Sequence, residues 1–233
     1  MTVEEAREFV SDAALWPRAR DFMWDFAPQI HPSWLEGLEL GAPGAGSDAG
    51  DAFLASCLPS PRVKKFILSS LGIEPVFHTF PKGDWSRLLV LDGATLLEIA
   101  KWLGAIVCAA ALRRVTDGAS VRGLKAALGG VYPEVFGFTI YFKGLENLCG
   151  EAPGRSAEDA VSAGAAILQS LVAPLPEPLS ARLKFKLPKT VFGSASARET
   201  ADSVREAGTK TDFGAAMAKL LKLKFPEAYS LCC

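Results

Sequence analysis

The sequence predicts a mainly α-helical protein, with residues 1–233 forming a single globular helical domain around a central apolar helix at about 95–115. Three observations lead to this fold class. Apolar residues recur at helical spacing in several segments, strand-like alternation is almost absent, and the composition is 49% hydrophobic and 22% charged. That balance is typical of globular proteins, and 233 residues are enough to bury one large core.

The central helix is predicted because the segment 95–115 is apolar on almost every side. Its start matches a capping box from Thr95 to Glu98, and Gly118 is expected to take the left-handed conformation that follows many helices. The segment also carries Glu98 and Lys101, which are costly inside a bilayer. We therefore expect a buried helix in the middle of the domain, and no membrane insertion.

Two more helices follow from one-sided apolar patterns. The first repeats apolar residues over 161–172, with Ser156 as its N-cap and Asp159 three residues later. The second runs over 213–221, with Asp212 at its start and lysines in its final turns, where positive charge opposes the helix dipole. Both are expected to pack through their apolar stripes.

Residues 113–142 are expected to continue as helices. A tight turn after the central helix leads into a short helix over 120–128 that stops at Gly129 and Gly130. The aromatic run 132–142 suits either a helix with proline in its first turn or a buried extended piece, and we favour the helix.

Two stretches are expected to lack helix. Residues 41–50 are rich in Gly, Ala and Pro and form a predicted loop. Prolines punctuate the segment 173–188, and apolar residues alternate with Arg182, Lys184 and Lys186. This alternation predicts a short extended segment at 179–187, the one place where the sequence suggests a strand.

The net charge of −1 hides an uneven distribution. Residues 1–60 hold 3 Lys or Arg against 10 Asp or Glu, and residues 61–233 hold 22 against 16. The acidic N-terminal segment 1–40 and the near-neutral total argue against a nucleic-acid binder, which usually has a basic domain. Contacts with protein partners fit this distribution better.

Targeting signals are not evident. The first eight residues contain three glutamates and no basic stretch ahead of an apolar one, which argues against a secretory signal peptide. Apolar runs do not reach the roughly 18 residues of a membrane span. The sequence therefore predicts a cytosolic protein.

Motifs for catalysis and cofactor binding are missing from the sequence. The nearest approach to a phosphate-binding loop, Gly118 to Lys125, lacks the Lys-Ser/Thr pair. His31 and His78 lie beside prolines and aromatic residues, where an imidazole usually has a structural role; an enzyme that uses either histidine is the weakest alternative. The five cysteines are expected to be free thiols, and neither a metal nor a cofactor is predicted.

A basic cluster is the candidate site. It consists of Arg113, Arg114, Arg122 and Lys125, on either side of the predicted turn. Guanidinium groups pair well with carboxylates on a partner surface, so we expect a protein-docking site. The alternative is a helical DNA-binding regulator that uses 113–125 as a helix-turn-helix. Steep loss of DNA affinity with salt would identify that alternative.

The order of several segments resembles the SctK (YscK-like) family of bacterial type III secretion systems. These segments span most of the chain and none is a catalytic signature. They are HPSWL at 31–35, LLVLD at 88–92, WLG at 102–104, LRRVTDGASVR at 112–122, YPEVF at 132–136 and KFPEAY at 224–229.

The resemblance implies a non-enzymatic cytosolic accessory protein of the sorting platform. SctK-like proteins link the cytoplasmic domain of the inner-membrane ring protein (SctD) to the pod protein (SctQ) beneath the injectisome. The resemblance therefore implies these two partners and a location at the cytosolic face of the bacterial inner membrane.

Overall fold

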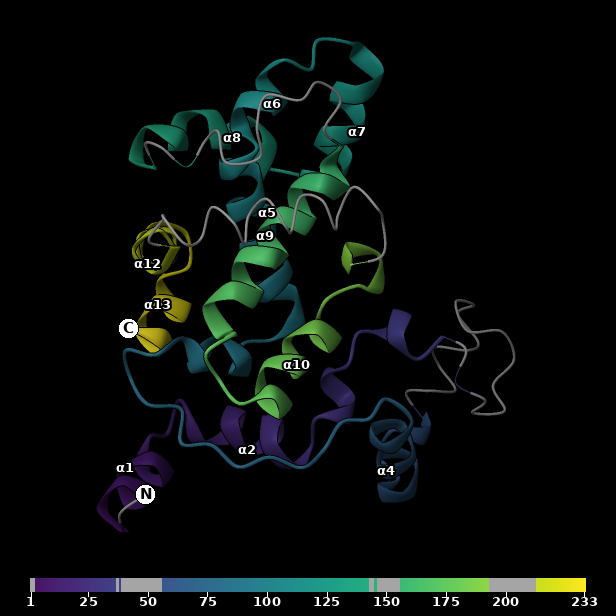
Figure 1. The fold of residues 1–233 in the computed structure, drawn as a ribbon, viewed down its shortest axis with the longest axis vertical. Coiled ribbons are helices and arrows are strands. Elements are labelled where there is room, and N and C mark those ends of the chain that lie inside the picture. Colours follow the sequence, from purple (N-terminus) through teal and green to yellow (C-terminus); the bar gives the residue numbers. More distant parts are fainter. Residues whose placement is uncertain (1–2, 37, 39–55, 143–144, 146–155, 193–212) are drawn as a thin grey trace. The chain divides into compact units, whose positions relative to one another are not determined.

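The computed structural model describes residues 3–36, 38, 56–142, 145, 156–192 and 213–233 (Figure 1). The protein is mainly helical, as predicted, and the described residues contain no strand. The predicted loop 41–50, Asp212 and Cys149 lie outside the described residues. No helix in the described part of the chain has both the length and the apolar character that a membrane span requires.

The chain divides into two compact units. Unit 1 comprises Met1–Gly93, Leu175–Lys189 and Ser230–Cys233, and unit 2 comprises Ala94–Pro174 and Thr190–Tyr229. The helices of unit 1 are α1 (Val3–Ser11), α2 (Trp16–Trp24), η1 (Ala27–Gln29), η2 (Pro32–Trp34), α4 (Pro61–Ser70), η3 (Trp85–Val90) and α10 (Glu177–Lys186).

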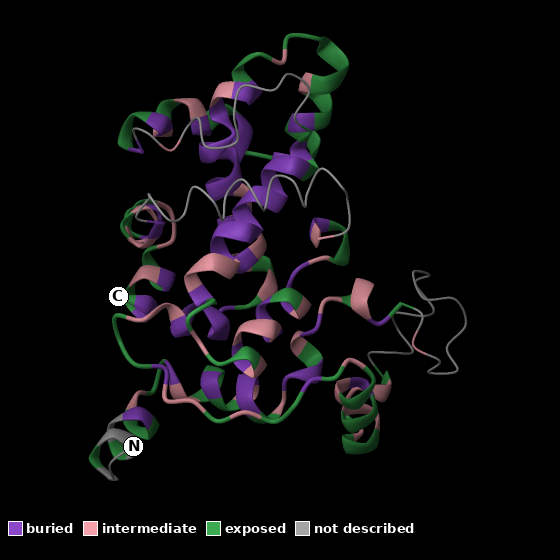
Figure 2. Ribbon diagram, viewed as in Figure 1, coloured by how far each residue is buried: buried purple, intermediate pink, exposed green. Residues whose placement is uncertain are grey.

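Unit 2 contains the longest helices, α5 (Gly93–Val107) and α9 (Ala157–Val172). Both are buried along most of their length (Figure 2). The remaining elements are α6 (Ala109–Arg113), α7 (Gly118–Leu128), α8 (Val131–Phe138), η4 (Thr139–Tyr141), η5 (Lys189–Phe192), α12 (Phe213–Lys224) and α13 (Pro226–Cys232). The first residue of α5, the first of η5 and the last residues of α13 belong to unit 1.

The predicted central helix is present as two helices. α5 ends at Val107 and α6 begins at Ala109, because Cys108 leaves helical geometry with ψ at 5°. Trp102, Leu103 and Ile106 are buried, as expected for a core helix. The predicted start was wrong: α5 begins at Gly93, so Thr95 lies inside the helix and is not its N-cap.

α5 and α9 pack closely at two glycines. A Cβ atom on Gly104 would lie 1.6 Å from the carbonyl oxygen of Ala160, and one on Gly164 would lie 1.8 Å from that of Ala100. Both distances are far below a normal contact, so the two backbones approach too closely for any side chain at these positions. α9 opens with the predicted capping box between Ser156 and Asp159.

The backbone angles test the predictions for the glycines at the two ends of α7. α7 stops at Gly129, as predicted, and this glycine has a positive φ of 58°; the aromatic run forms helix α8 and the turn η4, in line with the favoured helix. The expectation for Gly118 was wrong, because this residue starts α7 and its φ is not positive. Asp117 is the N-cap: its carboxylate accepts a hydrogen bond from the backbone N–H of Ser120 at 2.8 Å.

The extended segment predicted at 179–187 was wrong, because this region is helix α10. Pro176 is the N-cap residue and Pro178 lies in the first turn, where a missing N–H costs nothing. The helix buries Leu179, Arg182, Leu183 and Lys186, which have helical spacing. Two of these four buried residues are cations. Because the strand prediction assumed that cations are exposed, it took the pattern of apolar and charged residues for the alternation of a strand.

Candidate functional site

The basic cluster predicted from the sequence lies at an exposed corner of unit 2, formed by the end of α6, the following turn and α7 (Figure 2). We call Arg113, Arg114, Arg122 and Lys125 the basic corner; all four residues are exposed. Arg122 and Lys125 are three positions apart on α7, so they share one side of that helix.

Arg113 also supports the fold. Its Nη2 donates a hydrogen bond to Oγ1 of Thr139 at 2.7 Å and a longer one to the carbonyl oxygen of Phe136 at 3.4 Å. The guanidinium carbon lies 5.6 Å from the centre of the Phe136 ring, within cation–π range. Arg113 therefore ties α6 to the end of α8, and Arg122 and Lys125 are better positions for testing partner binding.

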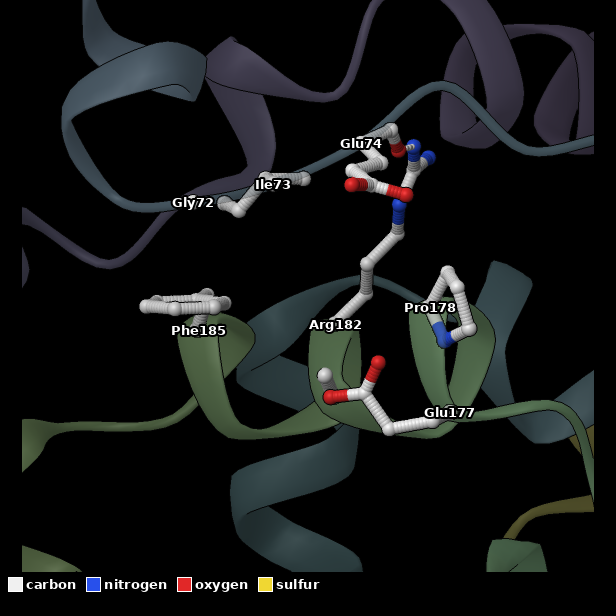
Figure 3. Close-up of a pocket in the computed structure, with 8 residues that line it drawn as sticks. Gly72, Ile73, Glu74, Glu177, Pro178, Arg182 and Phe185 are labelled. Atoms are coloured by element: carbon white, nitrogen blue, oxygen red, sulfur yellow. Dashed lines mark hydrogen bonds between the residues drawn. The ribbon is translucent and has the colours of Figure 1, made fainter.

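A second candidate is a pocket of unit 1 between α10 and the segment after α4 (Figure 3). Its volume is about 130 Å³, well below the several hundred Å³ of typical small-molecule sites. Arg182 extends from α10 toward Glu74, between Phe185 and Pro178 (Figure 3). The pocket is therefore too small for an ordinary metabolite.

Arg182 is already used by the fold. Its Nη1 donates to the carbonyl oxygens of Phe22 and, at 3.4 Å, Met23, which belong to the last turn of α2. Its Nη2 donates to the carbonyl oxygen of Glu74 at 2.5 Å. A cation at a helix C-terminus satisfies orphan carbonyl groups and opposes the helix dipole. Arg182 thus fastens α2 and the segment after α4 to α10.

Lys186 has the same role one turn later. Its Nζ donates to the carbonyl oxygens of Leu89 at 2.6 Å and Leu91 at 2.7 Å, at the end of η3. The ammonium also lies 5.1 Å from the centre of the Phe22 ring. Burial lowers the pKa of Lys186 to about 7, because removing the ammonium from water disfavours its charged form. With a side chain this deeply buried, Lys186 has no access to a solute.

The two histidines hold local turns. Nδ1 of His31 accepts a hydrogen bond from the backbone N–H of Ser33 at 3.2 Å, and Nδ1 of His78 accepts one from the N–H of Phe80 at 2.9 Å. Phe80 is a buried residue with a positive φ of 50°, so this hydrogen bond supports an unusual backbone conformation. Burial lowers the pKa of both histidines. This geometry supports the structural role expected for them.

The described cysteines are free thiols, and two of them, Cys108 and Cys232, are buried. Burial raises the pKa of Cys232 to about 12, which keeps the thiol protonated and unreactive. Within the described residues, no group of three or more His, Cys, Asp or Glu side chains is placed to hold a metal ion.

The sequence missed a group of exposed apolar residues beside Arg113. Thr139, which accepts from Arg113, is followed by Ile140 and Tyr141, both exposed. An aromatic and β-branched run gives no signal for exposure, because the same residues are common in cores. The structure therefore adds an apolar component to a site that the sequence described by charge alone.

Comparisons of the chain with models of known protein families, with curated proteins and with solved structures give no match.

Proposed function

We propose that this protein is a non-enzymatic adaptor of the type III secretion sorting platform. It would link the cytoplasmic domain of the inner-membrane ring protein (SctD-like) to the pod protein (SctQ-like) at the cytosolic face of the bacterial inner membrane. The observation that carries the proposal is the series of SctK-like segments in the same chain as a mainly helical fold.

Several of the SctK-like segments contribute contacts to the fold. In unit 1, the indole N–H of Trp34, in the segment 31–35, donates to the carbonyl oxygen of Leu187 at 2.8 Å. In unit 2, Arg113 contacts Phe136, which joins the segments 112–122 and 132–136. Nζ of Lys224, which opens the segment 224–229, lies 4.5 Å from the centre of the Trp102 ring. Side chains in these segments therefore hold parts of the chain together, as a segment shared by a family of folded proteins would.

The basic corner is the proposed docking site for one of the two partners. Exposed guanidinium and ammonium groups attract carboxylates on an approaching protein and accelerate association. Within the described residues, both hydrogen bonds of the Arg113 side chain are donated by Nη2. The N–H groups on Nε and Nη1 can therefore bind a partner's carboxylate.

The proposal is tested with purified proteins. The chain is mixed with the ring protein's cytoplasmic domain and with the pod protein, separately and together, and complexes are measured by calorimetry and size-exclusion chromatography. We expect binding to each partner and a three-component complex. If the chain binds neither protein, the adaptor proposal is wrong. Salt-dependent binding to duplex DNA in the same assays would instead favour the DNA-binding alternative.

A charge reversal tests the proposed docking site. Arg122→Glu with Lys125→Glu is expected to slow association with one partner by on the order of tenfold at low ionic strength, and less at high salt. The matched control is Arg62→Glu with Lys65→Glu on α4 of unit 1, which makes the same change of charge at exposed positions. Equal effects of the two reversals would mean that only net charge matters and would remove the basic corner as a site.

A further inference from the structure

Unit 2 exposes three large apolar side chains in its described residues. They are Ile140 at 63%, Tyr141 at 48% and Leu223 at 47% of full exposure. Single exposed apolar residues are common on protein surfaces, but neighbouring ones often mark an interaction site. If these three side chains lie together, they indicate an interaction site.

Contacts within unit 2 place them together. Nζ of Lys219 on α12 donates to the carbonyl oxygen of Tyr141 at 2.8 Å and lies 5.6 Å from the centre of its ring. Leu223 is four residues after Lys219, so it lies on the same side of α12. The contact of Lys219 with Tyr141 joins η4 to this side of α12, and we call Ile140, Tyr141, Lys219 and Leu223 the η4–α12 surface.

Arg113 lies next to the start of this surface. Its Nη2 donates to Oγ1 of Thr139, the residue directly before Ile140. The η4–α12 surface is thus an apolar centre that continues into the basic corner. An apolar centre with a polar rim is the usual anatomy of a protein–protein interface.

The charges on the contributing helices are mostly positive. α6, α8, η4 and α12 together carry Arg113, Lys219, Lys222 and Lys224 as cations, and Glu134 as their one carboxylate. Glu134 is already ion-paired with Nζ of Lys224. The rim therefore offers positive charge with little internal neutralisation, and its complement is a negatively charged partner.

We infer that the η4–α12 surface binds an acidic amphipathic segment of a partner protein. Apolar side chains of that segment would cover Ile140, Tyr141 and Leu223, and its Asp or Glu side chains would pair with Arg113 and Lys219. The inference stands apart from the proposed adaptor function, because it names the chemistry of the bound segment and not the protein that carries it.

Other occupants fit the surface less well. Two copies of this chain related by a twofold axis would bring the same cations together, which is unfavourable. Nucleic acid would leave the apolar centre without a matching group, because phosphate contacts supply most of its affinity. The apolar residues come from two elements, a 3-10 turn and a helix, so they form a receiving surface and not the continuous apolar helix face that inserts into a lipid bilayer.

Site-specific photo-crosslinking in cells that natively make the protein tests the inference. The photoreactive residue p-benzoyl-phenylalanine replaces Ile140 in the full-length chain, and Phe66, an exposed apolar residue of α4 in unit 1, in a control. After irradiation, the adduct is digested and the attached segment is sequenced by mass spectrometry. We expect an adduct at position 140 with a segment of another protein that combines apolar residues with an excess of Asp and Glu.

A second substitution checks the charge component. Lys219→Glu is expected to lower the yield of the adduct at position 140 by on the order of tenfold, and Lys65→Glu on α4 is expected to leave it unchanged. Circular dichroism of each variant confirms that the fold is intact, which is expected because all substituted positions are exposed.

Several results would overturn the inference. They are no adduct at position 140, or an adduct there with a second copy of the chain, with lipid, with nucleic acid, or with a segment of net positive charge. The outcome also separates this inference from the adaptor proposal. An acidic segment from the ring or pod protein supports both, whereas an acidic segment from an unrelated protein supports the η4–α12 surface and counts against the adaptor proposal.

Discussion

Replacing Gly104 with alanine should destabilise unit 2, although alanine is the better helix former. The added Cβ would lie 1.6 Å from the carbonyl oxygen of Ala160 and 3.1 Å from the backbone nitrogen of Gly164. Both are backbone atoms of α9, so no side chain can rotate away. Relief requires α5 and α9 to separate by more than an ångström.

The magnitude follows from two opposing effects. Overpacking a core costs about 1–3 kcal/mol, and a gap of about 0.5–1 Å already loses a quarter to a half of the dispersion energy across an interface. We therefore place the cost for Gly104→Ala at about 3 kcal/mol. The better helix propensity of alanine returns about 1 kcal/mol. The net loss is about 2 kcal/mol, a large part of the roughly 5–15 kcal/mol that stabilises a typical protein.

The assay is urea unfolding followed by circular dichroism at 222 nm. Gly123→Ala is the matched control: Gly123 lies inside α7, has an ordinary φ and has nothing within 4 Å of an added Cβ. This control should gain about 0.5–1 kcal/mol in unfolding free energy. If Gly104→Ala gained stability by the same amount, α5 and α9 would not pack as closely as the structure indicates.

Two further predictions concern stability. The lowered pKa of Lys186 implies that its charged form costs free energy in the folded protein; this cost is full below about pH 7 and disappears as pH rises toward the unfolded value of 10.5. The unfolding free energy of the parent should therefore rise over that range relative to Lys186→Met, and parallel pH profiles would refute the assignment. Ser156→Ala removes the N-cap of α9 and should cost about 1 kcal/mol in urea unfolding, whereas a change below about 0.3 kcal/mol would mean that the cap does not form.

Local sequence patterns predicted the elements whose signals are independent of the rest of the protein. The capping box at Ser156 depends on residues three positions apart, so it could be recognised directly. The end of α7 at Gly129 was predictable for the same reason, because paired glycines directly follow the helical pattern. The start of α5 was predicted wrongly, because the capping pattern at Thr95 to Glu98 lies inside a helix that begins at Gly93.

α10 shows where pattern reading fails. Arg182 and Lys186 face inward because the carbonyl groups that end α2 and η3 need donors there. These carbonyls come from segments about a hundred or more residues away along the chain. No local window of the sequence contains both partners, so the burial of the two cations could be seen only in the folded structure.

The same reasoning separates the two sets of cations in this protein. Arg182 and Lys186 find their acceptors within the chain, and removing either would leave buried carbonyl groups unpaired. Arg122 and Lys125 are exposed on α7, where charge is expected to affect association more than folding. Positive charge alone therefore does not identify a binding site, but an exposed cation beside uncovered apolar groups does indicate one. Arg113 meets this condition: it supports α8 through Thr139 and at the same time borders the exposed Ile140.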